Sequence, residues 1–246
     1  MSFLGESVGP RNLPPMMANA GISGYQWPYA YAQGGTPVPS LDIVFNAFVT
    51  ILVTIDPPGL APLFLALTGG MNRAERMQVG LRASLIGFIV MAVFAVAGTA
   101  ILAVFGITLP AFRVAGGLLL FYIAFEMVFE RRQERKERSA DKAITIDHIR
   151  NIAAFPLAIP LIAGPGAISA TVLLSGTFAG PVGHLALVAI IAFCILLTWL
   201  TFVAAERIDG FLGETGRSIL TRLLGVILAA LAVQFVADGI KALMSA

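Results

Sequence analysis

The sequence has few of the side chains that most enzymes and metal proteins use. It has one cysteine, Cys194, so an internal disulfide is excluded, and because Cys194 lies inside an apolar run we do not expect redox chemistry. The two histidines, His148 and His184, are far apart, and no zinc-type cluster of ligands can be read from the chain. No nucleophile–base pair is visible either. We therefore expect no enzyme, no metal and no cofactor.

Charge is also scarce. Charged residues make up 12% of the 246 residues, whereas a soluble domain carries about 25%. Hydrophobic residues make up 58%, and the mean hydropathy is +0.88, which indicates a membrane protein. The net charge of +2 does not point to nucleic acid, because the charges lie at the ends of apolar runs. No glycine-rich nucleotide-binding loop is present, so we do not expect ATP-driven activity.

Six apolar runs follow residue 40, and each is close to the length that a membrane-spanning helix needs. They predict an all-α membrane domain over residues 41–246, with halves at 41–130 and 151–246 joined by a basic loop at 130–151. Residues 1–40 are rich in Gly and Pro and lack the pattern of a signal peptide, so we expect a disordered or loosely packed tail. The runs lie at about 43–67, 82–105, 111–129, 152–174, 182–204 and 219–240.

The basic residues are distributed unevenly between the two sides of these spans. Of the 16 Lys and Arg residues, 13 lie in or beside the loops after the first, third and fifth spans. Loops rich in Lys and Arg stay in the cytoplasm. This asymmetry predicts three cytoplasmic loops, with the tail and both termini outside the cytoplasm.

Two of the six runs are interrupted by helix-breaking residues. The first contains Asp56-Pro57-Pro58-Gly59 and the fourth contains Ala163-Gly164-Pro165-Gly166. A residue before proline is disfavoured in the α region, and proline has no backbone N–H to donate. We expect the first helix to end near Ile55 and to restart with Asp56 as N-cap and Pro57 as the first helical residue.

The two breaks occupy matching positions in the two halves. They are related by an offset of 107 residues, and Arg113-Val-Ala-Gly116 matches Arg222-Leu-Leu-Gly225 at an offset of 109. Because each half has three spans, a repeat between them must be inverted in the membrane. We predict six transmembrane helices arranged as two inverted three-helix repeats, with broken first and fourth helices that restart near the bilayer midplane.

A half-helix that begins inside the membrane presents free N–H groups and a positive dipole end. Paired breaks of this kind mark the binding site in secondary transporters, and two such ends suit a substrate carboxylate. The alternative is that the prolines form kinks that serve packing only. The candidate substrate-binding residues are Thr54, Asp56, Pro57, Pro58, Gly59, Gly164, Pro165, Gly166, Ser169 and Gln234.

Several polar residues have two interpretations. Asp56 could bind a substrate amino group or carry a coupled proton, or it could simply cap its half-helix. The hydroxyls of Thr54 and Ser169 could meet substrate or bond the preceding helical turn. Arg113 and Arg222 lie near the starts of spans, where arginines reach the headgroups, and a gating or interface role is the alternative.

At these residues the chain resembles the MarC family of bacterial inner-membrane proteins, also described as the neutral amino acid transporter family. The resemblance covers about residues 41–245. Many family members have Asn where this chain has Asp56, which makes proton coupling more conceivable here. The motifs are Asp56-Pro57-Pro58-Gly59-Leu-Ala-Pro62-Leu-Phe64, Phe105-Gly-Ile-Thr-Leu-Pro110-Ala-Phe-Arg113-Val-Ala-Gly116-Gly117, Pro156-Leu-Ala-Ile-Pro160-Leu-Ile-Ala-Gly164-Pro165-Gly166 and Val233-Gln234-Phe235.

The resemblance implies a multi-pass protein of the bacterial inner membrane that transports small neutral amino acids such as alanine or glycine. A passive channel or a membrane sensor without coupled transport is the alternative. The expected partners are a small-molecule substrate and the lipid bilayer, with coupling to H⁺ or Na⁺ and homo-oligomerisation left open, and no nucleic acid. The substrate's identity and the direction of transport cannot be read from the sequence.

Overall fold

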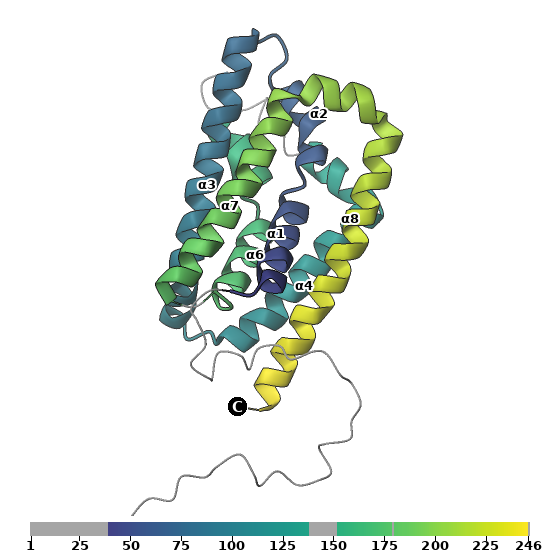
Figure 1. Ribbon diagram of the computed structural model, residues 1–246. Helices are drawn as coiled ribbons and strands as arrows, with labels where there is room; N and C mark the ends of the chain where they lie inside the picture. The colour runs from purple at the N-terminus through teal and green to yellow at the C-terminus, as the bar shows by residue number, and fades with distance from the viewer. Residues whose placement is uncertain (1–38, 138–151, 179, 246) are drawn as a thin grey trace, which may run out of the picture. The chain divides into compact units, whose positions relative to one another are not determined.

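The structure, a computed structural model, describes residues 39–137, 152–178 and 180–245, and the regular elements in these ranges are all helices (Figure 1). Most of the predicted tail, residues 1–38, and residues 138–151 of the predicted loop lie outside this described part. The elements are α1 (Leu41–Ile55), α2 (Pro57–Leu67), α3 (Arg73–Val104), α4 (Leu109–Val128), η3 (Ala153–Ile162), α6 (Pro165–Ser175), α7 (Gly180–Val203) and α8 (Ala205–Met244).

Within the described residues, five segments are long and apolar enough to cross a membrane, and the pair η3 and α6 makes a sixth, bent by 57° at its break. The first segment comprises α1 and α2 together. The predicted spans are recovered, with two differences in extent. The helix of the second span extends beyond its apolar run to Arg73, where Asn72 and Glu75 form a capping box. The last begins at Gly213, where a φ of 59° separates it from the first turns of α8.

The long helices pack as antiparallel pairs, and glycines set how closely they approach. At Gly117 of α4, an added Cβ would lie 3.0 Å from the carbonyl oxygen of Ala232 in α8. At Gly225 of α8, it would lie 3.1 Å from the carbonyl oxygen of Ala124 in α4. Small residues at such contacts are typical of membrane helices. Helix α3 packs in turn against α7 and against both parts of the broken fourth span.

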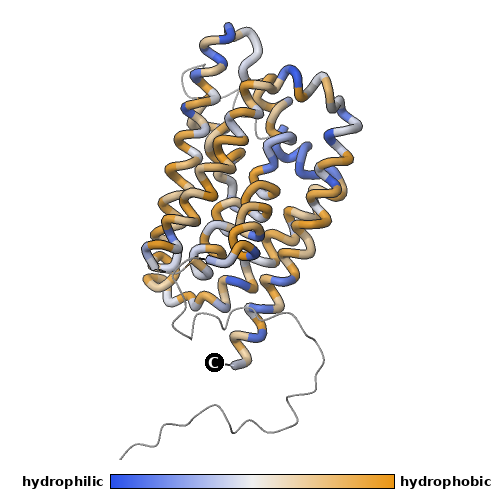
Figure 2. Tube along the Cα trace, viewed as in Figure 1, coloured by the Kyte–Doolittle hydropathy of each residue, from blue (hydrophilic) through white to orange (hydrophobic). Residues whose placement is uncertain are grey.

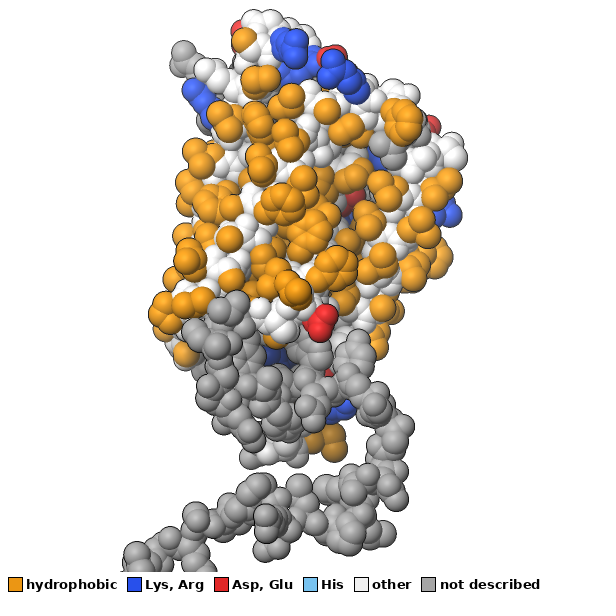
Figure 3. Space-filling model, in the orientation of Figure 1, with side chains coloured by type: hydrophobic (Ala, Val, Ile, Leu, Met, Phe, Trp, Pro, Cys, Tyr) orange, Lys and Arg blue, Asp and Glu red, His pale blue; other side chains and the backbone are white. Residues whose placement is uncertain are grey.

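The exterior is apolar along the long helices and charged at one end. Large hydrophobic side chains such as Leu85, Val93 and Phe193 are more than half exposed, as expected for a surface in contact with lipid. Figure 2 shows the hydrophobic colouring along α3, α7 and α8, and Figure 3 shows Lys and Arg gathered at the end that carries the turn between α2 and α3. The broken helices are enclosed: α1, α2, η3 and α6 supply much of the buried core.

Candidate functional site: two helix breaks and a buried basic segment

The first break has the predicted form. Helix α1 ends at Ile55, Asp56 adopts a left-handed conformation with φ 59° and ψ 65°, and α2 begins at Pro57. The backbone N–H of Gly59 donates to Asp56 Oδ1 at 3.2 Å, so the carboxylate caps its own half-helix. This confirms Asp56 as the N-cap and Pro57 as the first helical residue.

The other carboxylate oxygen of Asp56 is paired with Lys136, a residue that was not among the predicted site residues. Lys136 Nζ lies 3.0 Å from Asp56 Oδ2, and the two side chains are only 7% and 2% exposed. A buried ion pair of this kind is strongly destabilised when one partner is removed, because the other charge is left without compensation. Asp56 is therefore held from both sides, by the start of α2 and by Lys136.

Lys136 belongs to a short helical segment, residues 131–137, that follows α4 after a turn in which Glu130 has a φ of 62°. In Figure 2 this hydrophilic segment lies beside α2. Its Arg132 is also buried: one guanidinium nitrogen donates to the carbonyl oxygen of Thr54, and another lies 2.9 Å from Met127 Sδ. Residues 131–137 of the predicted basic loop are thus helical, and Arg132 and Lys136 are the buried residues among them.

The second break differs from the first in that its N-cap residue has no carboxylate to cap the helix that follows. Helix η3 ends at Ile162, and α6 begins at Pro165 after Gly164, whose φ of −81° and ψ of 171° are extended. Gly164 is the N-cap residue of α6 and makes no side-chain cap bond. A Cβ at Gly164 would lie 2.5 Å from the carbonyl oxygen of Pro160, so this position requires glycine. The helix restart at Pro165 is confirmed, and its positive dipole end is left available.

A cavity of about 170 Å³ lies between the last turn of α1 and the second break. Thr54, two residues before Asp56, lines it together with the start of α6, and the basic segment forms the rest of the polar wall. Four predicted site residues thus come together, and three cations that were not predicted join them. The lining includes Thr54, Ile123, Arg132, Arg135, Lys136, Pro160, Gly164, Pro165, Gly166 and Ala167.

Other predicted residues lie elsewhere. Pro57, Pro58 and Gly59 form the first turn of α2 around Asp56 and do not line the cavity. Ser169 is buried one turn beyond the start of α6, also outside the lining. Gln234 is exposed on α8, donates to Asp238 at 2.9 Å and does not line the cavity.

Arg113 and Arg222, the candidates for a gating or interface role, both lie where α4 and the turn after it contact α8. Arg113 packs beside Gly239 of α8, where an added Cβ would lie 3.0 Å from Arg113 Cβ. Arg222 of α8 pairs with Glu130 in the turn after α4, at 3.0 Å. Neither reaches the cavity. Their interface interpretation is consistent with these contacts, and a gating role stays a prediction.

The charges around the cavity are not balanced by one another. Arg135 pairs with the buried Glu126 at 2.8 Å, and Lys136 pairs with Asp56. Arg132 forms no ion pair with a described residue, and its Nε is buried without a hydrogen-bond partner there. Buried cations are normally compensated. The cavity therefore carries one positive charge and one hydrogen-bond donor that an anionic ligand could satisfy.

Burial also changes the proton affinity of the basic segment. Removal from water lowers the pKa of Lys136 from 10.5 to about 8, although the neighbouring Asp56 carboxylate raises it. Burial likewise lowers the pKa of Arg132, with Asp56 again acting in the opposite direction. Lys136 is consequently a group whose charge can change near physiological pH, in contact with the one acid at the first break.

The chain matches the MarC family of integral membrane proteins over residues 41–244. The chain belongs to the MarC family. Relatives in this family include the UPF0056 membrane proteins YvbG of Bacillus subtilis and YhcE of Escherichia coli, which are 36% and 34% identical to it. The alignments cover 80% and 81% of this chain and 94% and 92% of the relatives. A UPF0056 membrane protein of Archaeoglobus fulgidus is 36% identical over 81% of this chain and 93% of its own length.

No solved structure matches this MarC-family chain. The family names a membrane protein and no activity, so the chemistry of the site has to be argued from the residues. The signal that could have found the basic segment was the unpaired acid itself. Asp56 lies inside an apolar span, where an acid needs a partner, and the densest run of cations in the chain follows the third span.

Proposed function

We propose that this MarC-family protein is a secondary transporter of small neutral amino acids, and that the cavity between the breaks binds the substrate. The observation that carries the proposal is Arg132, a buried cation with an unpartnered donor that lines a cavity together with the uncapped start of α6. A substrate carboxylate there would meet a charge-assisted donor and a helix dipole. The small volume suits an amino acid of few atoms.

The inverted repeat forms part of this proposal. Spans that correspond in the two halves pack against each other: α4 with α8, and α3 with α7. Both broken spans restart with proline at the start of the second half-helix. These pairings support two three-helix halves of opposite orientation that rock around a site at the breaks. In this arrangement the basic end faces the cytoplasm of a bacterium and both termini lie outside the inner membrane.

The substrate's ammonium group would take the place of Lys136 on Asp56. Because the Asp56 charge holds the Lys136 pKa up, its loss to the substrate lowers that pKa further and releases a proton. The protein would then bind either the substrate or the proton on Lys136. Such competition couples movement of the substrate in one direction to movement of the proton in the other. This assigns the coupled proton to Lys136 and the recognition of the amino group to Asp56.

The test is counterflow of labelled alanine and glycine in proteoliposomes. Saturable counterflow should be lost in Arg132→Gln and retained in Arg131→Gln, a neighbouring arginine that is exposed. Flux that does not saturate would favour the alternative of a passive channel. Absence of flux for every amino acid, with the protein folded, would overturn the substrate class and leave an anion-binding sensor as the remaining interpretation.

A further inference from the structure

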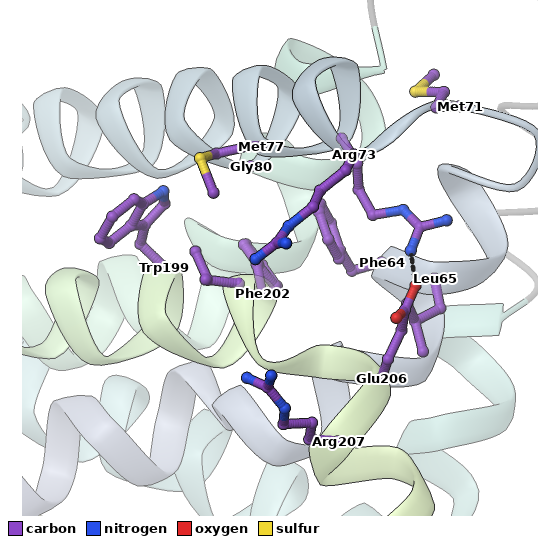
Figure 4. A pocket seen from close by; sticks show the side chains of 12 residues that line it. Phe64, Leu65, Met71, Arg73, Met77, Gly80, Trp199, Phe202, Glu206 and Arg207 are labelled. Atoms are coloured by element: carbon purple, nitrogen blue, oxygen red, sulfur yellow. Dashed lines mark hydrogen bonds and ion pairs between the residues drawn. The ribbon is translucent and has the colours of Figure 1, made fainter.

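A second cavity of about 360 Å³ opens at the basic end of the helices and shares no lining residue with the first. It lies where α2, α3 and α7 meet the start of α8 (Figure 4). Its apolar wall includes Phe64 and Phe202, whose rings stack with centroids 4.5 Å apart. Figure 4 shows Trp199 at one side of the cavity and Glu206 at the other, with Arg73 and Arg207 on either side between them. The cavity thus combines an aromatic wall with a charged rim.

The rim is rich in cations and in donors that lack partners. Arg73, Arg76 and Arg207 line it, and the one acid, Glu206, already pairs with Arg76. The Nε atoms of Arg76 and Trp199 are two separate buried donors, and neither has a hydrogen-bond partner among the described residues. Unsatisfied donors beside surplus positive charge call for an anionic group with several acceptor oxygens.

An apolar groove of about 300 Å³ continues from this cavity between α3 and α7, and Trp199 lines both. Leu81 and Leu85 of α3 form one side and are 53% and 55% exposed, and Ile195 and Leu196 of α7 form the other. The groove runs along the span, on a surface that faces lipid. A free inorganic anion would gain nothing from contact with this apolar groove, whereas a lipid acyl chain could bury its surface there.

We propose that these two features form one binding site for an anionic phospholipid of the leaflet on the basic side. The phosphate lies between Arg73 and Arg207, near Arg76 and Trp199, and an acyl chain lies in the groove beside Leu85. Basic pockets between spanning helices are suited to anionic headgroups, and the apolar groove adds affinity in proportion to the buried chain. The bound lipid would tie α3 to α7 and to the start of α8.

The experiment is native mass spectrometry of the full-length protein in detergent, titrated with phosphatidylglycerol, phosphatidylcholine of the same chains, and inorganic phosphate. We expect phosphatidylglycerol to bind with an affinity that falls roughly 30-fold in Arg73→Gln/Arg207→Gln, the combined effect of two basic residues at an anionic surface. The control Arg82→Gln removes an exposed arginine of α3 outside the cavity and should bind as wild type does.

The groove is tested separately, without touching an arginine. Ala192→Trp places a ring in the groove and should reduce phosphatidylglycerol binding, whereas Ala100→Trp, an exposed alanine of α3 outside the groove, should not. Equal binding of phosphatidylcholine would overturn the headgroup claim. Inorganic phosphate that binds as tightly as the lipid, or an unchanged affinity in Ala192→Trp, would overturn the lipid claim and leave an anion site. A shift to dimers in place of lipid adducts would assign the groove to a second copy instead.

Discussion

The two helix breaks are built from similar residues and end in opposite electrostatic states. At the first, Asp56 turns into the left-handed region, accepts from Gly59 and holds Lys136, so the start of α2 has its own anion. At the second, Gly164 stays extended, no side chain caps α6, and the N-terminus lines a cavity. The start of α2 is thus capped by a carboxylate of the protein, whereas the start of α6 has no capping side chain at its N-cap residue, Gly164.

The largest expected effect comes from removing the anion of the first break. Asp56→Ala deletes the cap of α2 and leaves Lys136 buried without its partner, which should destabilise the protein by about 3–5 kcal/mol. The measurement is the thermal unfolding midpoint in detergent, followed by size-exclusion chromatography. The matched control Asp42→Ala removes an exposed acid of α1 and should cost less than about 1 kcal/mol.

The double variant Asp56→Ala/Lys136→Met sharpens the same comparison. If the cost comes from an uncompensated charge, the second substitution should restore a large part of the midpoint. A double variant as unstable as Asp56→Ala alone would contradict this, and would place the cost in the lost cap.

Much of this comparison can be predicted from the sequence, because it depends on local chemistry. Prolines and glycines fix where α1 and η3 end, and the Asn72 and Glu75 pair fixes where α3 begins. The partner of Asp56 cannot be read in this way. Hydropathy assigns a charged stretch after an apolar span to a loop, and Lys136 is 80 residues away from Asp56 in the chain. The same limit explains Gln234: being inside a span does not say which face the side chain takes, and here it takes the exposed one.

The second break should be sensitive to size rather than to charge. Gly164→Ala brings a methyl group within 2.5 Å of the Pro160 carbonyl oxygen, so the backbone at the start of α6 has to move. Overpacking of this kind costs about 1–3 kcal/mol, which corresponds to roughly 5- to 150-fold in the affinity for alanine. Gly210→Ala is the control, because no atom lies within 4 Å of its added methyl group. Isothermal titration with alanine checks both, and equal affinities would show that α6 does not bind the substrate.

The junction between the breaks should respond to pH through Lys136. Its pKa is lowered to about 8, and a substrate that takes Asp56 lowers it further, so binding releases a proton. Affinity for alanine should therefore rise with pH from about 7 to 8.5, by at most about tenfold per pH unit. Lys136→Arg, which stays charged over this range, should give a flat profile. Identical slopes in the two proteins would rule out Lys136 as the coupled group.

The smallest expected effect lies outside both breaks, at the pair of Arg222 with Glu130. This pair is about half exposed, and such pairs contribute about 0–1 kcal/mol, so Arg222→Gln should barely move the unfolding midpoint. Yet Glu130 is in the turn that leads into the basic segment 131–137, which carries Arg132 and Lys136. If this segment moves during transport, Arg222→Gln should change the counterflow rate of alanine without changing its affinity. An unchanged rate would leave the pair as a surface contact between α8 and the turn after α4, and the other contacts of the segment, such as those to Thr54, Asp56 and Glu126, would then hold it in place.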